Sequence, residues 1–393
     1  MAKVLLVDTN FSSRPIFNYL VKLGHEVHVV GSNPYDCLAQ TSERYWQVDY
    51  ADTRALSVLV EKEKFRYLVP GCTDRSYSSC AIVAQGRFPG IASVSVDQDL
   101  NHKDLFRSLG ERIGLPVPKL QWKDSLQLKS KSFPVAGNLH WPLVVKPVDG
   151  FSGKGIAILQ RSEEFMLHEA MSTARSISSR GQCIIESYVH GQLHSHSAFL
   201  NGGQVVSDVI VEEHCTANPV VVDTSRVLPI IRDNVRDKLR RSIELLAKEL
   251  ELTDGLVHTQ FILNGDDISL IEITRRCPGD LYSQLIELSG YKDYVSNYVR
   301  PFLGLPLEGF KLQTYVPIMR HTVTVPVNQN FDHLHFRQIV SLERWVPLAV
   351  TGQNLGASPA GRVGILFTRA NDEAQLSKIY ATTLARELYE VVG

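Results

Sequence analysis

Residues 142–159, PLVVKPVDGFSGKGIAIL, are the stretch from which the rest of the chain can be interpreted. The stretch opens with an apolar, β-branched run at 143–145 and closes with another at 156–159, which predicts two short buried strands. The loop between them contains three glycines and Lys154. Glycines let the backbone approach an anion closely, and free N–H groups beside a lysine suit a phosphate. The loop therefore predicts a phosphate site, with an ordinary glycine-rich hairpin turn as the alternative.

This loop differs from two common phosphate-binding loops. A Walker A loop joins a strand to a helix and has Ser or Thr after its lysine. Here Gly155 follows Lys154, and a strand is expected next. Protein kinases carry a G-x-G-x-x-G loop near the start of their domain and a later H-R-D, and the sequence has neither. Both classes of nucleotide-binding protein are therefore disfavoured.

Composition and charge narrow the class of protein further. The 393 residues suffice for two or three domains, and 44% hydrophobic with 21% charged residues is typical of a globular protein with a sizeable core. The net charge of −1 offers no basic field, so we expect no nucleic-acid partner. No apolar run approaches membrane-spanning length, and we expect no membrane partner. The six cysteines form no C-x-x-C pair and no signal peptide is evident, which predicts reduced thiols in a cytoplasmic protein.

The first hundred residues predict a small parallel α/β domain, residues 1–100. Apolar strands alternate with helical patterns, which is typical of a parallel sheet. The turn after the first strand, residues 9–13, has no glycine, so the dinucleotide fingerprint of an NAD-dependent oxidoreductase is absent. The expected strands are KVLLVD at 3–8, HEVHVVG at 25–31, YLVP at 67–70 and IASVS at 91–95, and the expected helices span 14–23, 53–64 and 75–86.

The rest of the chain predicts two further units. A central domain is expected over 101–310, with a glycine-loop subdomain at about 115–188, and a small C-terminal α+β domain over 311–393. Asn264 and Gly265 separate two apolar runs, which is a strong hairpin signal. Other expected features are helices at 101–109, 162–175, 232–251, 280–289 and 372–391, strands at 182–188, 194–200, 205–212, 256–263 and 268–273, and an exposed loop at 123–140.

The predicted hairpin carries a candidate metal site. Gln260 lies on its first strand and Glu272 on its second, each between apolar neighbours. Side chains on adjacent antiparallel strands can face each other, and a buried glutamate is costly unless it is paired or binds a metal. Oxygen ligands from two strands suit Mg²⁺, which takes nucleotide phosphates as further ligands. The alternative is that Glu272 forms an ion pair with Arg275 or Arg276.

Five segments together resemble the ATP-grasp superfamily over residues 100–290. In chain order they are NHKDLFRSLGERIGLPVP, PLVVKPVDGFSGKGIAIL, IIESYVHGQ, GLVHTQFIL and LIEITRRCPGD. The resemblance is to the carboxylate–amine ligase type, similar to carbamoyl-phosphate-synthase-like and L-amino-acid-ligase-like enzymes. It implies a parallel α/β domain, then an ATP-grasp domain of two α+β subdomains, then a small C-terminal α+β domain.

The resemblance also implies an activity. An ATP-dependent, ADP-forming ligase would activate a substrate carboxylate as an acyl phosphate and join it to an amine. Its cofactors would be ATP and Mg²⁺, with Mn²⁺ as a substitute, and its partners would be small-molecule carboxylate and amine substrates. A homodimer is left open. A bicarbonate-activating carboxylase-like enzyme and a non-catalytic ATP-binding regulator are the alternatives.

Individual residues receive roles from the same resemblance. Arg276 and Lys154 would act on the transferred phosphoryl group. Gln260, Glu272 and Thr274 would bind the metal, and Arg275, Gly279 and Asp280 would lie beside the substrate. The nucleotide-binding residues would be Lys103, Lys146, Gly150, Phe151, Ser152, Gly153, Gly155, Glu186, Tyr188, Val189 and Gln192.

Three departures from the family pattern bear on these roles. The last motif of the family is often Glu-x-Asn-Pro-Arg, and here Thr274 replaces the asparagine. The metal position on the preceding strand is often Glu, and here it is Gln260. The ribose-binding glutamate falls at Leu193, so ribose contacts would come from Gln192, His194 or elsewhere. These departures keep the regulator alternative open.

Five side chains have competing interpretations. His194 and His196 share one strand face without a third ligand, which favours partly buried strand histidines over a metal site. Asp280 is expected to be a helix N-cap, with a charge that pairs with a substrate ammonium group as the alternative. Arg320 and His321 are expected to be exposed, with a position along the substrate cleft as the alternative.

Overall fold

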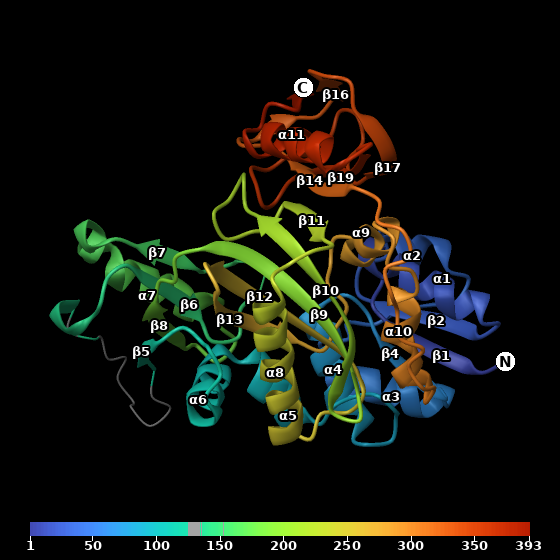
Figure 1. The fold of residues 1–393 in the computed structure, drawn as a ribbon. Helices are drawn as coiled ribbons and strands as arrows, with labels where there is room; N and C mark the ends of the chain where they lie inside the picture. Colours follow the sequence, from blue (N-terminus) through green and yellow to red (C-terminus); the bar gives the residue numbers. More distant parts are fainter. Residues whose placement is uncertain (125–133, 135, 152) are drawn as a thin grey trace.

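The structure is a computed structural model that describes residues 1–124, 134, 136–151 and 153–393. Figure 1 shows the sheet of the N-terminal part in blue on one side, a small green sheet on the other, and a long central sheet between them. The C-terminal residues, in red, lie at one end of the central sheet. In the described part of the chain, no helix is long and apolar enough to cross a membrane.

The N-terminal sheet is parallel, as the alternation of strands and helices predicts. Its strands lie in the order β3-β2-β1-β4. The strand expected at 91–95 is wrong, because Ser93 accepts a hydrogen bond from the N–H of Val96 and so begins a helix. The elements are β1 (Lys3–Val7), η1 (Phe11–Ser13), α1 (Arg14–Lys22), β2 (Glu26–Gly31), α2 (Cys37–Thr41), β3 (Tyr45–Gln47), α3 (Thr53–Glu63), β4 (Tyr67–Pro70), α4 (Asp74–Ala84) and α5 (Val94–Asn101).

The small sheet contains the glycine-loop stretch in the predicted strand-loop-strand form. It is antiparallel, in the order β5-β8-β6-β7, and Leu143 pairs with Leu159. Most of the loop expected at 123–140 lies outside the described residues. The elements around this sheet are α6 (Lys103–Ile113), β5 (Leu120–Lys123), η2 (Ala136–Asn138), β6 (Leu143–Pro147), β7 (Ala157–Leu159), η3 (Arg161–Met166), α7 (Leu167–Ile177) and β8 (Cys183–Ser187).

The central sheet has eight strands in the order β13-β12-β9-β10-β11-β14-β19-β17. The predicted hairpin is its β12–β13 pair, closed where Asn264 pairs with Asp267. The sheet continues past residue 311, so the boundaries 1–100, 101–310 and 311–393 stay a prediction. The elements here are β9 (Gln192–Asn201), β10 (Gln204–His214), β11 (Thr224–Leu228), α8 (Asp233–Glu249), β12 (Gly255–Asn264), β13 (Asp267–Thr274), α9 (Tyr282–Leu288), α10 (Tyr294–Val299), η4 (Arg300–Leu303), β14 (Ile318–Thr324), β17 (Ser341–Pro347) and β19 (Arg362–Arg369).

The C-terminal end differs from its prediction in one element. The helix expected at 372–391 ends earlier, as α11 (Glu373–Leu384), and the chain turns at Arg386 into β20 (Tyr389–Val392). Leu388 is fully buried and Tyr389 pairs with Phe336, so strand pairing and burial replace the last helical turns. The remaining short strands are β15 (Gln329–Asn330), β16 (His333–Phe336) and β18 (Asn354–Leu355).

Alternation along β9 assigns the two faces of the central sheet. Ala198 and Leu200 pack in a core cluster with α8, whereas Phe199 packs in the cluster that contains α9 and the N-terminal sheet. Because successive side chains of a strand point to opposite faces, Ser195 lies on the side of Phe199. This face, toward α9, is where the candidate site forms.

Candidate active site

A row of polar side chains crosses six strands of the central sheet on the face toward α9. The predicted opposition of Gln260 and Glu272 is confirmed, because the two residues pair across β12 and β13. Strand pairing and one hydrogen bond, from Ser195 to Glu213, connect the remaining members. From end to end this polar row consists of Glu272, Gln260, Ser195, Glu213, Ser225 and Arg320.

Lys103 joins the glycine loop to one end of the polar row. Its Nζ donates hydrogen bonds to the carbonyl oxygen of Gly150 (2.8 Å) and to Oε1 of Glu272 (3.1 Å). The lysine is buried, but the side chain of Glu272 is 43% exposed. Glu272 thus pairs with Lys103 rather than with Arg275 or Arg276, the alternative raised by the sequence. One side of the Glu272 carboxylate therefore remains accessible to a ligand.

A second lysine and glutamate form a closed cluster behind the loop. Lys146 Nζ contacts Oε1 of Glu186, and Arg107 Nε donates to Oε2 (2.9 Å). All three side chains are buried. Burial pushes the pKa of Glu186 upward, but the charges of Arg107 and Lys146 outweigh it and hold this pKa below its usual value. Burial also lowers the pKa of Lys146.

Arg107 is a site residue that the sequence reasoning missed. It lies four residues after Lys103 on α6, so both side chains lie on one helix face. The four-residue spacing could have indicated from the sequence that Arg107 lies beside Lys103. Its Nη2 also donates to the carbonyl of Ile271 (2.7 Å), while Nη1 is buried without a hydrogen-bond partner among the described residues. A buried donor of this kind is suited to a bound acceptor.

The glycine loop has an anchored base and an exposed tip. Asp149 accepts hydrogen bonds from Ser178 (2.5 Å) and from Ser179. Gly153 and Gly155 have φ angles of +70° and +72°, which favour glycine. A Cβ on Gly150 would lie 2.4 Å from Cγ of the Pro147 ring. Phe151 and Lys154 have exposed side chains, and Ser152 lies outside the described residues.

The proposed hinge residues follow Glu186 along the chain. Tyr188 donates its N–H to the carbonyl of Pro142 (3.1 Å), which ties the hinge to β6, and its ring meets His190 edge to face. Val189 is half-buried. Gln192 Nε2 donates to the carbonyl of Glu213 (2.6 Å). Its amide nitrogen is therefore already used within the protein.

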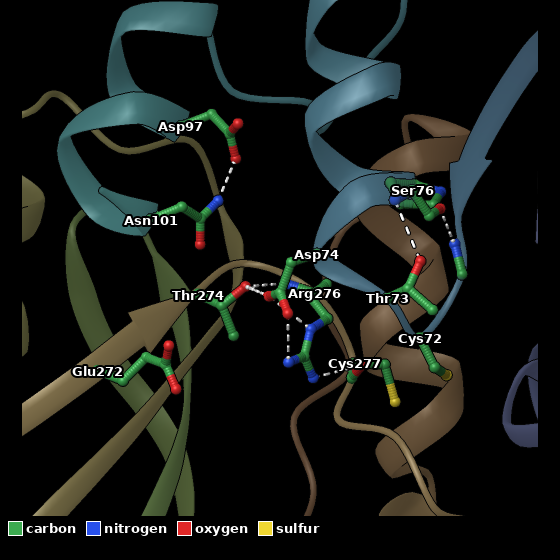
Figure 2. Close-up of polar contacts among 12 residues, drawn as sticks. Cys72, Thr73, Asp74, Ser76, Asp97, Asn101, Glu272, Thr274, Arg276 and Cys277 are labelled. Carbon is green, nitrogen blue, oxygen red and sulfur yellow. Dashed lines mark hydrogen bonds and ion pairs between the residues drawn. The ribbon is translucent and has the colours of Figure 1, made fainter. Parts of the chain in front are cut away.

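Figure 2 shows Asp74, the first residue of α4, between Thr274 and Arg276, with Glu272 on the same strand as Thr274. Arg276 donates from Nε to Oδ1 of Asp74 (2.8 Å) and from Nη2 to Oδ2 (2.9 Å), and Thr274 Oγ1 donates to Oδ1 (3.3 Å). Burial alone would lower the pKa of Arg276. The negative charge and hydrogen bonds of Asp74 outweigh burial, so the pKa of Arg276 lies above its usual value. Asp74 was not singled out from the sequence, because the contact joins residues about 200 apart.

Arg275 does not join this group. Its Nη2 donates to the carbonyls of Thr253 (2.7 Å) and Asp254 (3.1 Å), and the side chain is buried. Arg275 therefore binds the backbone just before β12, whereas Arg276 binds Asp74. Gly279 is half-buried, and a Cβ there would lie 3.7 Å from the carbonyl oxygen of Cys72.

Asp280 is not the N-cap of α9. The cap position belongs to Leu281, without a side-chain hydrogen bond, and both residues have left-handed φ angles of +52° and +56°. The carboxylate of Asp280 instead pairs with Arg320 (3.2 Å) and Arg362 (2.7 Å). Left-handed backbone in two adjacent non-glycine residues is costly and is typical of functional positions. These ion pairs replace both the cap and a free charge for a substrate ammonium group.

The expectation that Arg320 and His321 are exposed is wrong. Both are 3% exposed, because β14 lies inside the central sheet between β11 and β19. His194 and His196 are also more deeply buried than expected: His194 Nδ1 lies 2.9 Å from the carbonyl oxygen of Gln192, and His196 Nε2 lies 3.0 Å from Asp208. In the part of the chain that the structure describes, no group of three or more His, Cys, Asp or Glu is arranged to hold a metal.

Comparison with known proteins agrees with this geometry. Residues 139–284 match the family model described as ATP-grasp domain. This segment is similar to an ATP-grasp domain. The match confirms the resemblance, and it covers the glycine loop, the hinge and the metal motif. Lys103 and Arg107 of α6 precede the matched segment.

Proteins similar to this chain include two formate-dependent phosphoribosylglycinamide formyltransferases. The protein from Histophilus somni (strain 129Pt) is 26% identical over 188 residues, which are 48% of this chain and 47% of the relative. The protein from Burkholderia lata is 24% identical over 319 residues, 78% of this chain and 76% of the relative. The chain therefore spans about half the length of the first and three quarters of the second.

Two solved structures establish the fold across the whole chain. The L-amino acid ligase from Bacillus licheniformis has a TM-score of 0.77 at 16% identity, covering 100% of this chain and 98% of that one. Phosphoribosylglycinamide synthetase from Anaerococcus prevotii has a TM-score of 0.71 at 13% identity, covering 100% and 99%. The expected combination of a parallel α/β sheet with antiparallel α+β parts is confirmed.

Glu213 is the main residue of the polar row that was not predicted from the sequence. It is the second-last residue of β10, it is buried, and its two oxygens accept hydrogen bonds from Ser195 and Gln260. Burial raises its pKa. Adjacent glutamates at a strand end were a weak signal, since the sequence alone does not show which of Glu212 and Glu213 faces the polar row.

Proposed function

We propose that this protein is an ATP-dependent, ADP-forming ligase that joins a small carboxylate to an amine and acts in the cytoplasm. The observation that carries the proposal is the position of Lys103, which links the carbonyl of Gly150 in the glycine loop to Glu272 in the polar row. A loop suited to phosphates and a carboxylate suited to a metal ion therefore lie on either side of one ammonium group. This arrangement is what transfer of a terminal phosphoryl group requires.

The donor atoms near Glu272 fit Mg²⁺, with Mn²⁺ as a substitute. Glu272, Gln260 and Thr274 supply oxygen, the donor type that Mg²⁺ prefers. The Nε2 of Gln260 is used by Glu213, which leaves the amide oxygen for a metal ion. Three protein oxygens do not fill an octahedral shell, so the nucleotide phosphates and water would complete it. A bound metal would neutralise phosphate charge during transfer.

The chain's own residues have distinct proposed tasks in binding ATP. Lys103, Lys146 and the backbone of Gly150, Gly153 and Gly155 would hold the phosphates. The backbone of residues 186–189 would bind the adenine ring, and Gln192 lies nearby for the ribose. Lys154 has an exposed side chain on the loop, and its ammonium group would bind the terminal phosphate.

The substrate carboxylate would accept the terminal phosphoryl group of ATP and become an acyl phosphate. The amine would then attack the acyl carbon, its proton would leave, and phosphate would depart. Arg276 would steady the phosphoryl group, and Asp74 would orient its guanidinium. The names of two relatives, a formate-dependent formyltransferase and an L-amino acid ligase, support a small carboxylate as one substrate.

The test is ADP release with Mg²⁺ in a screen of amino acids and small carboxylates, followed by mass spectrometry of the products. We expect release to require both a carboxylate and an amine, and Glu272→Ala to abolish it while the protein stays folded. Glu43→Ala, on a side chain that is 91% exposed, is the matched control. Nucleotide binding without turnover under every condition would favour the regulator alternative. Bicarbonate-dependent release would favour the carboxylase alternative.

A further inference from the structure

Glu213 lies at the centre of a hydrogen-bonded chain that ends at the proposed metal position. Ser195 Oγ donates to its Oε1 (2.7 Å), and Gln260 Nε2 donates to its Oε2 (2.7 Å). Ser195 Oγ also lies 2.5 Å from the hydroxyl of Tyr282 on α9. Glu213 is 3% exposed, so water does not compete for its oxygens. The carboxylate is therefore held in place from two sides.

The chemistry of these groups sets the orientation of the Gln260 amide. Both oxygens of Glu213 accept hydrogen bonds, from Ser195 and from Gln260, as those of a carboxylate do, whereas an amide has a donor end and an acceptor end. The NH₂ end of Gln260 must face Glu213. The carbonyl end is then left for the opposite side, where Glu272 pairs with Gln260 across β12 and β13. An unrestrained amide could instead turn its N–H groups toward the metal, which would repel the cation.

We propose that Glu213 is a positioning residue that fixes Gln260 as a neutral oxygen ligand for the metal ion bound with ATP. The inference rests on the proposed function and explains how glutamine serves where related proteins often have glutamate. Gln260 and Glu213 together carry one negative charge, as a glutamate at position 260 would. The charge lies two strands away, on β10 rather than β12, behind the ligand and toward Ser225 and Arg320 in the polar row.

A purely structural role is the competing interpretation, in which Glu213 stabilises the sheet and has no influence on the metal. The two interpretations differ in what responds to mutation. A structural residue changes the melting temperature and affects nucleotide binding with and without metal alike. A residue that orients Gln260 changes metal affinity selectively.

The test is Glu213→Gln. This variant keeps the shape of the side chain, but its amide replaces one accepting oxygen with an NH₂ group that donates hydrogen bonds. Mn²⁺ affinity is measured by electron paramagnetic resonance with a non-hydrolysable ATP analogue present, and affinity for the analogue without metal is measured by calorimetry. We expect Mn²⁺ to bind at least about tenfold more weakly, the factor that corresponds to 1.4 kcal/mol. Metal-free affinity for the analogue should stay within twofold of wild type.

Two further variants make the test specific. Glu287→Gln is the matched control, because that largely buried glutamate also accepts from an amide, Gln284 (3.3 Å), and a backbone N–H, Val295 (3.0 Å). It should leave Mn²⁺ affinity unchanged. The double variant Glu213→Gln/Gln260→Glu returns the charge to the ligand position and should restore most of the Mn²⁺ affinity. If Glu213→Gln does not fold, Glu213→Asp keeps the charge but withdraws it from Gln260, and the same loss is expected.

Unchanged Mn²⁺ affinity in folded Glu213→Gln, or an equal loss with and without metal, would overturn the role of Glu213. The proposed function would survive that result as long as wild type binds the analogue and Mn²⁺ together. If wild type binds neither, the proposed function itself fails. The two failures are therefore distinguishable.

Discussion

Two lysine–glutamate pairs in the same site differ in accessibility. Lys146 and Glu186 lie in the small sheet, and their side chains are 5% and 2% exposed. Lys103 and Glu272 link the glycine loop to the central sheet, and the glutamate is 43% exposed. Glu186 also binds Arg107, so two cations neutralise it, whereas Glu272 has one. The same residue types thus make a closed cluster in one place and an open carboxylate in the other.

The position of each strand explains the difference. β8, with Glu186, lies between β5 and β6, while β13, with Glu272, is an edge strand of the central sheet. Breaking a buried ion pair leaves an uncompensated charge and typically costs about 3–5 kcal/mol, whereas an exposed pair contributes about 0–1 kcal/mol. The closed cluster is therefore expected to act on stability and pocket shape, and the open pair on ligand binding.

Glu186→Ala should produce the largest change in stability. It would leave Lys146 and Arg107 buried without their anion, and we expect the free energy of unfolding to fall by about 3–5 kcal/mol. Chemical denaturation, with Glu272→Ala as the partner variant, measures the contrast. Glu272→Ala should lose less stability than Glu186→Ala, because Glu272 is partly solvated and Lys103 keeps its hydrogen bond to the carbonyl of Gly150. Equal losses for the two variants would contradict the distinction between closed and open pairs.

Lys103→Met should separate binding from stability. Loss of a charged donor to the phosphates is expected to weaken ATP binding by about 1.5–3 kcal/mol. Stability should change little, because Glu272 remains solvated. Lys146→Met should weaken ATP binding similarly and also lower the melting temperature. Calorimetry and thermal denaturation of both variants give the comparison, and unchanged ATP affinity in Lys103→Met would remove this lysine from the site.

Asp280 is an intermediate case, since its carboxylate is 30% exposed but pairs with the buried Arg320. Asp280→Ser should cost about 1–3 kcal/mol of stability, because Arg320 loses its anion. A serine cannot compensate as a cap here, since Asp280 does not cap α9. Urea denaturation measures the loss. A variant as stable as wild type would show that Arg320 is satisfied by its contacts to Ser225 and Thr322.

His321 should affect only stability, and only at acidic pH. Burial lowers its pKa to about 4, and both ring nitrogens are close to hydroxyls, of Thr224 (2.8 Å) and Tyr389 (2.6 Å). The folded protein keeps this histidine neutral while the unfolded chain protonates it below about pH 6.5. The free energy of unfolding should therefore decrease as pH falls from about 6.5 to about 4, by up to about 1.4 kcal/mol per pH unit.

The measurement for His321 is urea denaturation at several pH values. His321→Gln should reduce the dependence on pH below 6.5 and leave the curve above pH 7 parallel to that of wild type. ATP affinity should be unchanged, because His321 follows Arg320 on β14 and so lies on the face of the sheet opposite the polar row. A variant with the same pH dependence as wild type would show that other groups determine it.

Local patterns were sufficient to predict the main elements. The apolar runs on either side of the glycine loop, the Asn264-Gly265 turn and the alternation of the first hundred residues depend on neighbours in the sequence, and each was confirmed. Two predictions of local secondary structure were wrong. Ser93 began a helix where a strand was expected, and residues after Arg386 formed a strand because Leu388 and Tyr389 found partners in the C-terminal core.

The sequence by itself determined which kinds of group the site contains: a glycine loop, lysines, and oxygen donors on two strands of a hairpin. Tertiary structure decided how these groups are used. Asp74 lies about 200 residues from Arg276, and Glu213 lies 47 residues from Gln260, yet each pair is hydrogen-bonded. Tertiary structure also decided which side chains are exposed. Glu272 is partly exposed because β13 is an edge strand, and Arg320 is buried because β14 is an inner strand. The physical reason is that burial and pairing depend on which strands become neighbours, and no short-range pattern specifies that.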